Sequence, residues 1–216
     1  RRSDSCCRPT TRATRRSPHE SPCHQWLRRI DRSAPNESRT KLSQKPADIE
    51  SGSAPGLTIR ITAGSGWGRT TMAAFDSALR SAGVADHNLV RLSSVIPPGA
   101  QVSRCEPDQQ LRGEFGDILY CVYAAAYATE RGGDAWAGVG WSRVMDGSDR
   151  GLFVEHTGYS EEQVNSMIQM SLADMNAGRD RSFVFEDQLL SSAHCSAQPA
   201  CAVVVATYRT RGWYDQ

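Results

Sequence analysis

Lysine is almost missing from this chain of 216 residues. Its two lysines, Lys41 and Lys45, both lie near the start, so residues 57–216 contain no amine side chain. A lysine is the residue that carries pyridoxal phosphate and that forms Schiff bases in many aldolases. Residues 57–216 therefore offer no candidate for either chemistry, and an electron sink in this part of the chain must come from another source.

Long apolar runs, a secretory signal and paired metal-binding cysteines are also missing. No apolar run is long enough to span a bilayer, and the opening RRSDSCCRPTTRATRRSPHES has no apolar core after it. The seven cysteines form no CxxC pair, and His87, His156 and His194 show no i,i+4 spacing. We therefore expect a cytoplasmic protein with reduced cysteines, no membrane association and no metal.

Charge is unevenly distributed along the chain. Residues 1–56 hold 12 of the 25 basic and 6 of the 24 acidic side chains, together with many Ser, Pro and Thr residues. Such a composition is typical of a disordered basic extension. A spurious upstream translation stays open as a second interpretation. The interspersed acids and the single aromatic residue, Trp26, argue against a nucleic-acid arm, so no nucleic-acid partner is expected.

Two helices and about seven strands are predicted from Leu57 onward. Apolar or alternating runs predict strands at 57–63, 88–96, 117–129, 134–144, 151–158, 182–194 and 200–209. Helical spacing predicts helices over 70–83 and 160–178, the second beginning with a capping pattern at Ser160. We expect 100–115 to be a loop. Two helices placed far apart among many strands favour an α+β sandwich, each helix covering an outer face.

The segment Gly64-Ser65-Gly66-Trp67-Gly68, between the first strand and the first helix, raises the possibility of phosphate binding. Its pattern is GxGxG, however, and it has neither the GxGxxG of dinucleotide-binding proteins nor the GK[ST] of a P-loop. No strand-helix-strand repeat continues it. Glycines of a tight turn, or glycines that line a substrate site, are the favoured interpretation.

Two adjacent serines, Ser93 and Ser94, close an apolar strand just before the break Pro97-Pro98-Gly99. With AGSGWGRTTMAAFDSALRSAG before them and GLFVEHTGYS after them, the chain resembles the pyruvoyl-dependent arginine decarboxylases over essentially all of residues 57–216. The resemblance implies a four-layer αββα sandwich of two mainly antiparallel sheets. It also implies a homo-trimer of cleaved protomers, with sites formed between neighbours.

The resemblance implies that the precursor cuts itself between Ser93 and Ser94. The Ser94 hydroxyl would attack the Ser93 carbonyl carbon, and elimination from the resulting ester would leave a dehydroalanine that hydrolyses to a pyruvoyl group. A Schiff base between this ketone and L-arginine would accept the electrons released as carbon dioxide leaves, which yields agmatine. Such a catalyst needs no pyridoxal phosphate and no metal.

Four positions take family roles by their match to the motifs. Ser94 is the pyruvoyl precursor, and Ser93 becomes the new carboxyl terminus. Asn88 matches an asparagine that assists processing, Glu155 matches the glutamate that protonates the carbon left by carbon dioxide, and Asp76 matches the acid that pairs with the guanidinium. Without the resemblance, these would be an ordinary strand end, a turn residue, a solvent-facing strand position and a solvated helix position.

Other functions stay open at this point. The same chemistry could act on another amino acid such as histidine, because pyruvoyl histidine decarboxylases share the fold and the Ser-Ser cut. A binding domain in which Ser93 and Ser94 stay joined is a further alternative, as is a nucleic-acid binder that uses the basic extension. Trp67 and Arg69 depart from the family pattern, and a cation such as Arg69 is unfavourable beside a cationic substrate.

Overall fold

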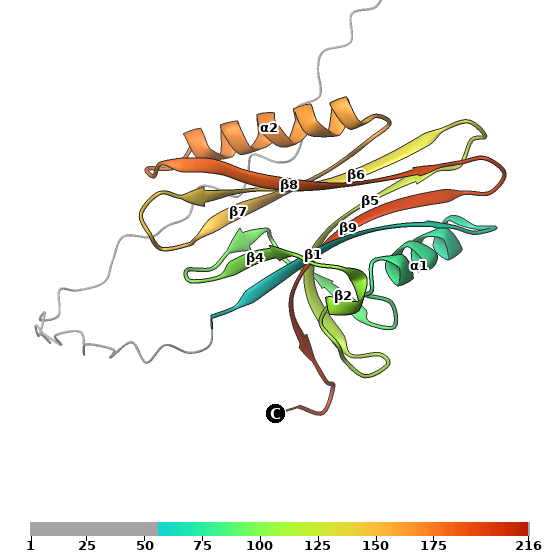
Figure 1. Cartoon of the computed structure of the whole chain (residues 1–216), viewed down its shortest axis with the longest axis horizontal. Helices are drawn as coiled ribbons and strands as arrows, with labels where there is room; N and C mark the ends of the chain where they lie inside the picture. Colours follow the sequence, from blue (N-terminus) through green and yellow to red (C-terminus); the bar gives the residue numbers. More distant parts are fainter. Residues whose placement is uncertain (1–55, 216) are drawn as a thin grey trace, which may run out of the picture. The chain divides into compact units, whose positions relative to one another are not determined.

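Two β-sheets and two α-helices make up the part of the chain that the computed structural model describes, residues 56–215 (Figure 1). The five-stranded sheet has the order β2 (Asn88–Arg91), β5 (Ile118–Ala128), β9 (Ala200–Arg211), β1 (Thr58–Trp67) and β4 (Gln101–Arg104). The four-stranded sheet has the order β3 (Val95–Ile96), β7 (Gly151–Gly158), β6 (Asp134–Val144) and β8 (Phe183–His194). Among these strands only the pairs β1–β4 and β2–β5 are parallel. The predicted α+β sandwich of mainly antiparallel sheets is confirmed.

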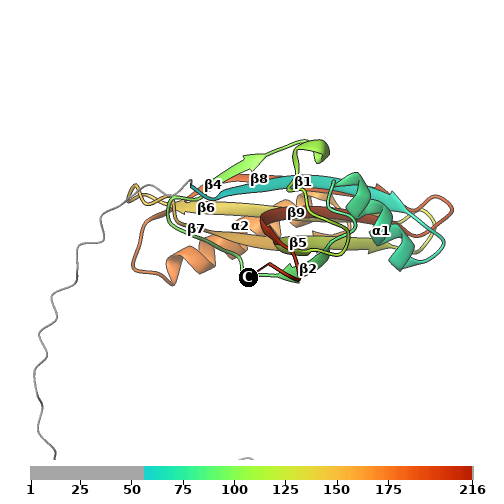
Figure 2. The ribbon, with the colours of Figure 1, turned by 90° about the horizontal axis from the view of Figure 1, so that it is seen from below.

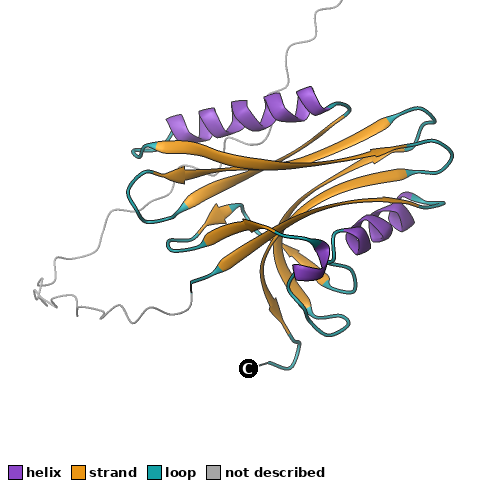
Figure 3. Ribbon diagram, in the orientation of Figure 1, coloured by secondary structure: helices purple, strands orange, loops and turns teal. Residues whose placement is uncertain are grey.

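Each sheet has one face on a shared core and the other face under a helix (Figure 3). The helix α1 (Thr71–Ser81) packs against β1 and β9, and α2 (Glu161–Ala177) packs against β6 and β7. Alternate strand residues such as Val122, Val139 and Phe153 fill the core between the sheets. Figure 2 shows β4 and β2 at opposite edges of the five-stranded sheet. The layer order is therefore helix, sheet, sheet, helix.

Both helices begin where the sequence predicts. The Thr70 hydroxyl accepts a hydrogen bond from the Ala73 amide at 3.1 Å, and the Ser160 hydroxyl accepts one from the Gln163 amide at 3.2 Å. These bonds satisfy amides that have no partner inside the helix. The apolar stripe of α2 buries Val164, Ile168 and Leu172 against the four-stranded sheet. None of the helices in residues 56–215 is long and apolar enough to cross a membrane.

The glycine-rich segment is strand and not loop, which corrects the sequence prediction. β1 continues to Trp67, and α1 lies directly over its glycines. A Cβ added at Gly64 would lie 2.4 Å from the Ala78 carbonyl oxygen, and one at Gly66 would lie 2.3 Å from the Ala78 nitrogen. The missing side chains therefore allow the helix to approach the strand. The helix occupies the space that a phosphate would need.

The predicted strand 88–96 is two strands in two different sheets. β2 pairs with β5 in the five-stranded sheet, and β3 pairs with β7 in the four-stranded sheet. The chain crosses between the sheets at residues 92–94, where Ser94 has φ 68°. The predicted loop 100–115 is also wrong in part, because it contains β4 and a short 3-10 helix, η2 (Pro107–Gln109). The paired serines thus lie at the junction of the two sheets.

Candidate active site

Ser94 has a strained backbone conformation, and hydrogen bonds to both sheets hold the segment 92–94. Its φ of 68° is in the left-handed region, which costs a residue other than glycine about 1–3 kcal/mol. The Phe153 amide of β7 donates to the Ser94 carbonyl at 2.8 Å, and the Leu92 amide donates to the Cys121 carbonyl of β5 at 2.9 Å. No hydrogen bond engages the Ser93 carbonyl within residues 56–215. Strain of this kind gathers at functional sites.

The side chain of Ser94 meets the carboxylate of Glu155. Its hydroxyl donates a hydrogen bond to Glu155 Oε1 at 2.7 Å. Glu155 follows Phe153 by two residues in β7, so both side chains lie on the face that is turned toward the other sheet. The Glu155 side chain is only 13% exposed. The structure therefore brings together two of the residues that the sequence singles out, from positions 61 apart.

Arg91 is a site residue that the sequence analysis missed. Its guanidinium Nη2 lies 3.5 Å from Glu155 Oε1, and its Cζ lies 5.3 Å from the centre of the Tyr123 ring. A cation over an aromatic face is attracted by the ring, which keeps the guanidinium beside the carboxylate. The alternation along β2 shows which residues share a face with Arg91, but it does not show what that face contacts. No local signal could show that this face meets a carboxylate from another sheet.

A cavity of about 450 Å³ opens beside Glu155. It is lined by Arg91, Tyr123, Ala124, Ala125, Tyr127, Glu155, His156 and Thr157. β2 pairs only with residues 118–121 of β5, and β3 only with residues 151–152 of β7. The residues of β5 after 121 and those of β7 after 152 therefore form an edge of their sheets, with no strand beside them on that side in the described part of the chain. The cavity lies across these two edges, and its volume is that of a small-molecule site.

Asn88 and Asp76 lie apart from this cluster. The Asn88 amide donates to the Gly116 carbonyl at 2.5 Å, at the start of β2. Asp76 is on the exposed side of α1, where its carboxylate pairs with Arg80 at 2.8 Å. Neither side chain hydrogen-bonds Ser93, Ser94 or Glu155 anywhere in residues 56–215. One protomer thus assembles only Ser93, Ser94 and Glu155 of the predicted set.

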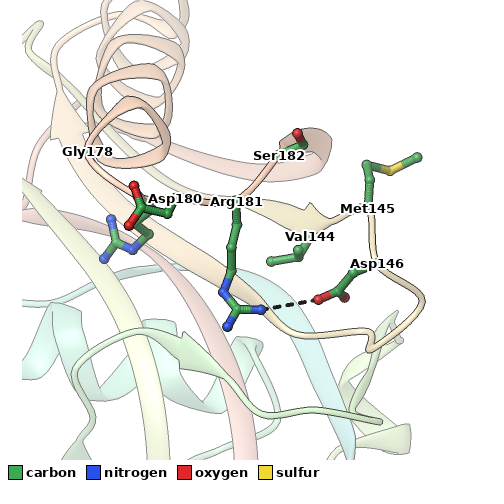
Figure 4. Close-up of a pocket in the computed structure, with 8 residues that line it drawn as sticks. Val144, Met145, Asp146, Gly178, Asp180, Arg181 and Ser182 are labelled. Carbon is green, nitrogen blue, oxygen red and sulfur yellow. Dashed lines mark hydrogen bonds and ion pairs between the residues drawn. The ribbon is translucent and has the colours of Figure 1, made fainter.

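A larger depression, of about 800 Å³, lies near the end of α2 and contains none of the predicted site residues (Figure 4). Arg181 Nη1 and Asp146 Oδ2 lie 3.3 Å apart across it. Two acids, Asp146 and Asp180, and two arginines, Arg179 and Arg181, line the depression, so their formal charges balance. Its chemistry is that of a solvated ion-pair network, and Ser94 remains the candidate centre.

The histidines and cysteines of residues 56–215 form no group of three possible metal ligands with each other or with acids. His156 Nε2 is 2.8 Å from the Ser171 hydroxyl of α2, and His194 Nδ1 is 2.7 Å from Asp134 Oδ1. Burial raises the pKa of the Cys121 and Cys201 thiols to about 12, which keeps both protonated at neutral pH. These two thiols are therefore poor nucleophiles and pack as small apolar groups.

Comparisons with known proteins identify the same segment of the chain. Residues 58–211 match the family model described as pyruvoyl-dependent arginine decarboxylase. A protein of that name from Halobacterium salinarum is 36% identical over 154 residues, which is 69% of this chain and 92% of the relative. One from Thermoplasma volcanium is 31% identical over 154 residues, covering 64% and 84%. One from Picrophilus torridus is 34% identical over 105 residues, covering 49% and 57%.

Proposed function

The chain belongs to the pyruvoyl-dependent arginine decarboxylase family, and from that premise we propose that it converts L-arginine to agmatine and carbon dioxide after cutting itself between Ser93 and Ser94. Membership implies a pyruvoyl cofactor. We propose that Ser94 is its source and that the reaction needs neither pyridoxal phosphate nor a metal ion. The domain that does this is residues 57–216, and residues 1–56 take no part in the chemistry; the predicted basic extension lies outside the described residues except for residue 56.

The observation that carries the proposal is the contact between the Ser94 hydroxyl and Glu155. The hydrogen bond of 2.7 Å to Glu155 fixes the orientation of the Ser94 side chain and so holds its oxygen ready to attack the Ser93 carbonyl carbon. The positive φ of Ser94 adds backbone strain that cleavage at this residue would release. The Phe153 amide, which donates to the Ser94 carbonyl, would hold residue 94 in place after the cut. The residues present therefore fit a pyruvoyl group at position 94.

The cleavage balances with the atoms of the chain and one water molecule. The Ser94 oxygen forms a bond to the Ser93 carbonyl carbon, and the bond from that carbon to the Ser94 nitrogen breaks, which gives an ester. Removal of the Ser94 α-proton then expels the Ser93 carboxylate and leaves a dehydroalanine at position 94. Water converts this residue to the pyruvoyl group and releases ammonia. Ser93 becomes the carboxyl terminus of the first fragment.

Glu155 and Arg91 have roles in the decarboxylation that follow from their positions. The pyruvoyl group supplies a ketone that condenses with the substrate amine and withdraws electrons as carbon dioxide leaves. Glu155, which lies 2.7 Å from the position of the Ser94 hydroxyl, delivers a proton to the carbon that carbon dioxide leaves. Arg91, whose guanidinium lies 3.5 Å from Glu155 Oε1, holds that side chain in position beside residue 94.

Asp76 and Asn88 complete the site from a neighbouring protomer in this proposal. Asp76 selects arginine, because a carboxylate and a guanidinium form two parallel charge-assisted hydrogen bonds. Asn88 assists processing of the chain. Both side chains are exposed and lie apart from Ser94 within one protomer, which supports a site shared between subunits. We expect the assembly to be a homo-trimer of cleaved protomers, and the free edges of β5 and β7 are available for such contacts.

Intact mass measurement of the denatured protein tests the proposal before any assay of activity. We expect two fragments, residues 1–93 and residues 94–216, the second with a ketone in place of the serine amine. Arginine added to this material should then yield agmatine and carbon dioxide in equal amounts. A single chain that stays uncut on prolonged incubation would contradict the proposal and favour a binding domain with Ser93 and Ser94 intact.

A further inference from the structure

A β-bulge in β9 places a tyrosine beside the proposed cleavage site. Cys121 of β5 pairs with Thr207, while Tyr120 pairs with Arg209, so Tyr208 is the extra residue of β9. A bulge bends its strand and redirects a side chain, and bulges are over-represented next to active sites. Only 8% of Tyr208 is exposed, and its side chain lies in the core between the two sheets.

The Tyr208 side chain contacts the chain just after Ser94 in two ways. Its hydroxyl donates a hydrogen bond to the Val95 carbonyl at 3.0 Å. Its ring packs edge-on against Phe153, with centroids 6.2 Å apart, and the Phe153 amide in turn donates to the Ser94 carbonyl. Since β9 and β3 belong to different sheets, the hydroxyl joins the two sheets at the junction.

The Tyr208 hydroxyl is a permanent hydrogen-bond donor. Burial raises the pKa of Tyr208 well above its ordinary range, and the negative charge of Glu155 adds to the effect. The hydroxyl therefore keeps its proton at any pH near neutrality. A buried hydroxyl without a partner is unfavourable, so the bond to Val95 is maintained.

We infer that Tyr208 is a positioning residue for self-cleavage, whose hydroxyl holds the Val95 carbonyl so that Ser94 keeps the left-handed backbone in which its own hydroxyl meets Glu155. The inference rests on the proposed function. Hydrogen bonds at Leu92, Ser94 and Val95 fix the segment on both sides of the scissile bond, and Tyr208 supplies the one at Val95. Its role ends with the cut, because a pyruvoyl group has no amide nitrogen and hence no φ to restrain.

Tyr208→Phe tests this inference, since phenylalanine keeps the ring and its packing and removes only the hydroxyl. The rate of self-cleavage, followed by intact mass in freshly made protein, should fall about three- to tenfold, the effect of one hydrogen bond. Turnover of arginine per pyruvoyl group should stay within about twofold of the wild-type value. Tyr120→Phe is the matched control, because Tyr120 packs on the same core and its hydroxyl makes no hydrogen bond within residues 56–215.

The outcomes separate this inference from the function on which it rests. Cleavage of Tyr208→Phe at the wild-type rate would overturn the role of the hydroxyl while leaving the enzyme's function intact. Equal losses in cleavage and in turnover per pyruvoyl group would show a general distortion of the site and would also overturn it. A wild-type chain that never cleaves removes both the function and the inference. Should Tyr208→Phe fail to fold, Tyr208→Met is the second variant, because methionine fills irregular core space without a hydroxyl, and the same ratio of cleavage rate to turnover per pyruvoyl group is measured.

Discussion

The carboxylate of Glu155 has two roles in the proposed chemistry, one before cleavage and one during decarboxylation. Before cleavage its Oε1 accepts the Ser94 hydroxyl at 2.7 Å, which requires only an oxygen acceptor. During decarboxylation it has to give a proton to carbon, which requires an acid. An amide can perform the first task and not the second. A single substitution at this residue can therefore separate processing from turnover.

Glu155→Gln should leave self-cleavage in place and abolish most of the turnover. The glutamine Oε1 can still accept the Ser94 hydroxyl, but its amide has no acidic proton to deliver, so we expect kcat to fall by about a hundredfold or more. Intact mass and carbon dioxide release measure the two steps. Glu162→Gln, at an exposed position on α2, is the matched control and should change neither. Unchanged turnover in Glu155→Gln would refute the proton-donor role.

Asp76→Ala should reduce the selection of arginine. The loss of charge-assisted hydrogen bonds to the guanidinium is expected to lower kcat/KM for arginine by about 10- to 100-fold, with a smaller effect on an analogue whose side chain is neutral. The comparison of the two substrates is the measurement. Asp180→Ala removes a carboxylate from another exposed position and serves as the control. A variant that keeps its full arginine preference would overturn the assignment of Asp76.

At the scale of the elements, the contact of α1 with β1 depends on the glycines of the strand. A Cβ at Gly66 would lie 2.3 Å from the backbone nitrogen of Ala78, and backbone cannot move aside as a flexible side chain can. The helix would have to lift from the sheet. Because Asp76 lies on the same helix, such a shift would also move the proposed guanidinium partner.

Gly66→Ala should therefore lower the free energy of unfolding by about 1–3 kcal/mol, as other overpacked cores do. Urea unfolding followed by circular dichroism measures the change. Gly178→Ala is the control, because Gly178 has φ −78° and the nearest atom to its added Cβ would be 3.7 Å away. Equal stability of Gly66→Ala and the wild type would mean that the helix does not lie as closely on the strand as the structure has it.

The docking of α2 on β7 should depend on pH through His156. Burial lowers the pKa of His156 from its ordinary 6.5, although the charge of Glu155 acts in the opposite direction. The unfolded chain then binds more protons than the folded one as the pH falls below 6.5, so stability present above that pH is lost on acidification. Urea unfolding above and below pH 6.5 should show this loss of stability, and His156→Gln should show less of it. Identical pH dependence in the two proteins would contradict the prediction.

At the scale of the whole domain, cleavage after Ser93 would not separate the two fragments. The first fragment contributes β1, which lies between β9 and β4 of the second fragment, and eight residue pairs join β1 to β9. α1 also packs on β9. We therefore expect the fragments to stay together under native conditions and to part only on denaturation. This arrangement lets the cut change the chemistry of residue 94 while the sandwich persists.

A chain that begins at Leu57 should cleave itself and decarboxylate arginine with rates within about twofold of the full chain, because β1 begins at Thr58 and the described site residues all follow it. Intact mass and agmatine formation are the measurements. The same preparations, sized in solution, test the homo-trimer. Loss of activity in a truncated chain that is folded would show that residues 1–56 take part in the function.

The amino-acid sequence alone was sufficient to predict much of this domain. Apolar or alternating runs marked β5, β6 and β7, and helical spacing marked both helices, with a capping pattern at Ser160 for α2, because these patterns depend on neighbours within a few positions. The absence of lysine from residues 57–216 excluded pyridoxal phosphate enzymes and Schiff-base aldolases from the candidate functions. The serine pair and Glu155 were found through the motifs that surround them, and the structure joins them by a hydrogen bond.

Only the tertiary structure decided how residues from separate strands meet. The alternation of a strand shows which side chains share a face but not which sheet the strand joins, so 88–96 read as one strand although it is two. Arg91 and Tyr208 gave no local signal, because their partners Glu155 and Val95 belong to the other sheet. The glycines of β1 read as a loop because the sequence predicted the helix but could not show that it packs directly on the strand. Contacts across the two sheets bring distant residues together, and a pattern of near neighbours cannot encode them.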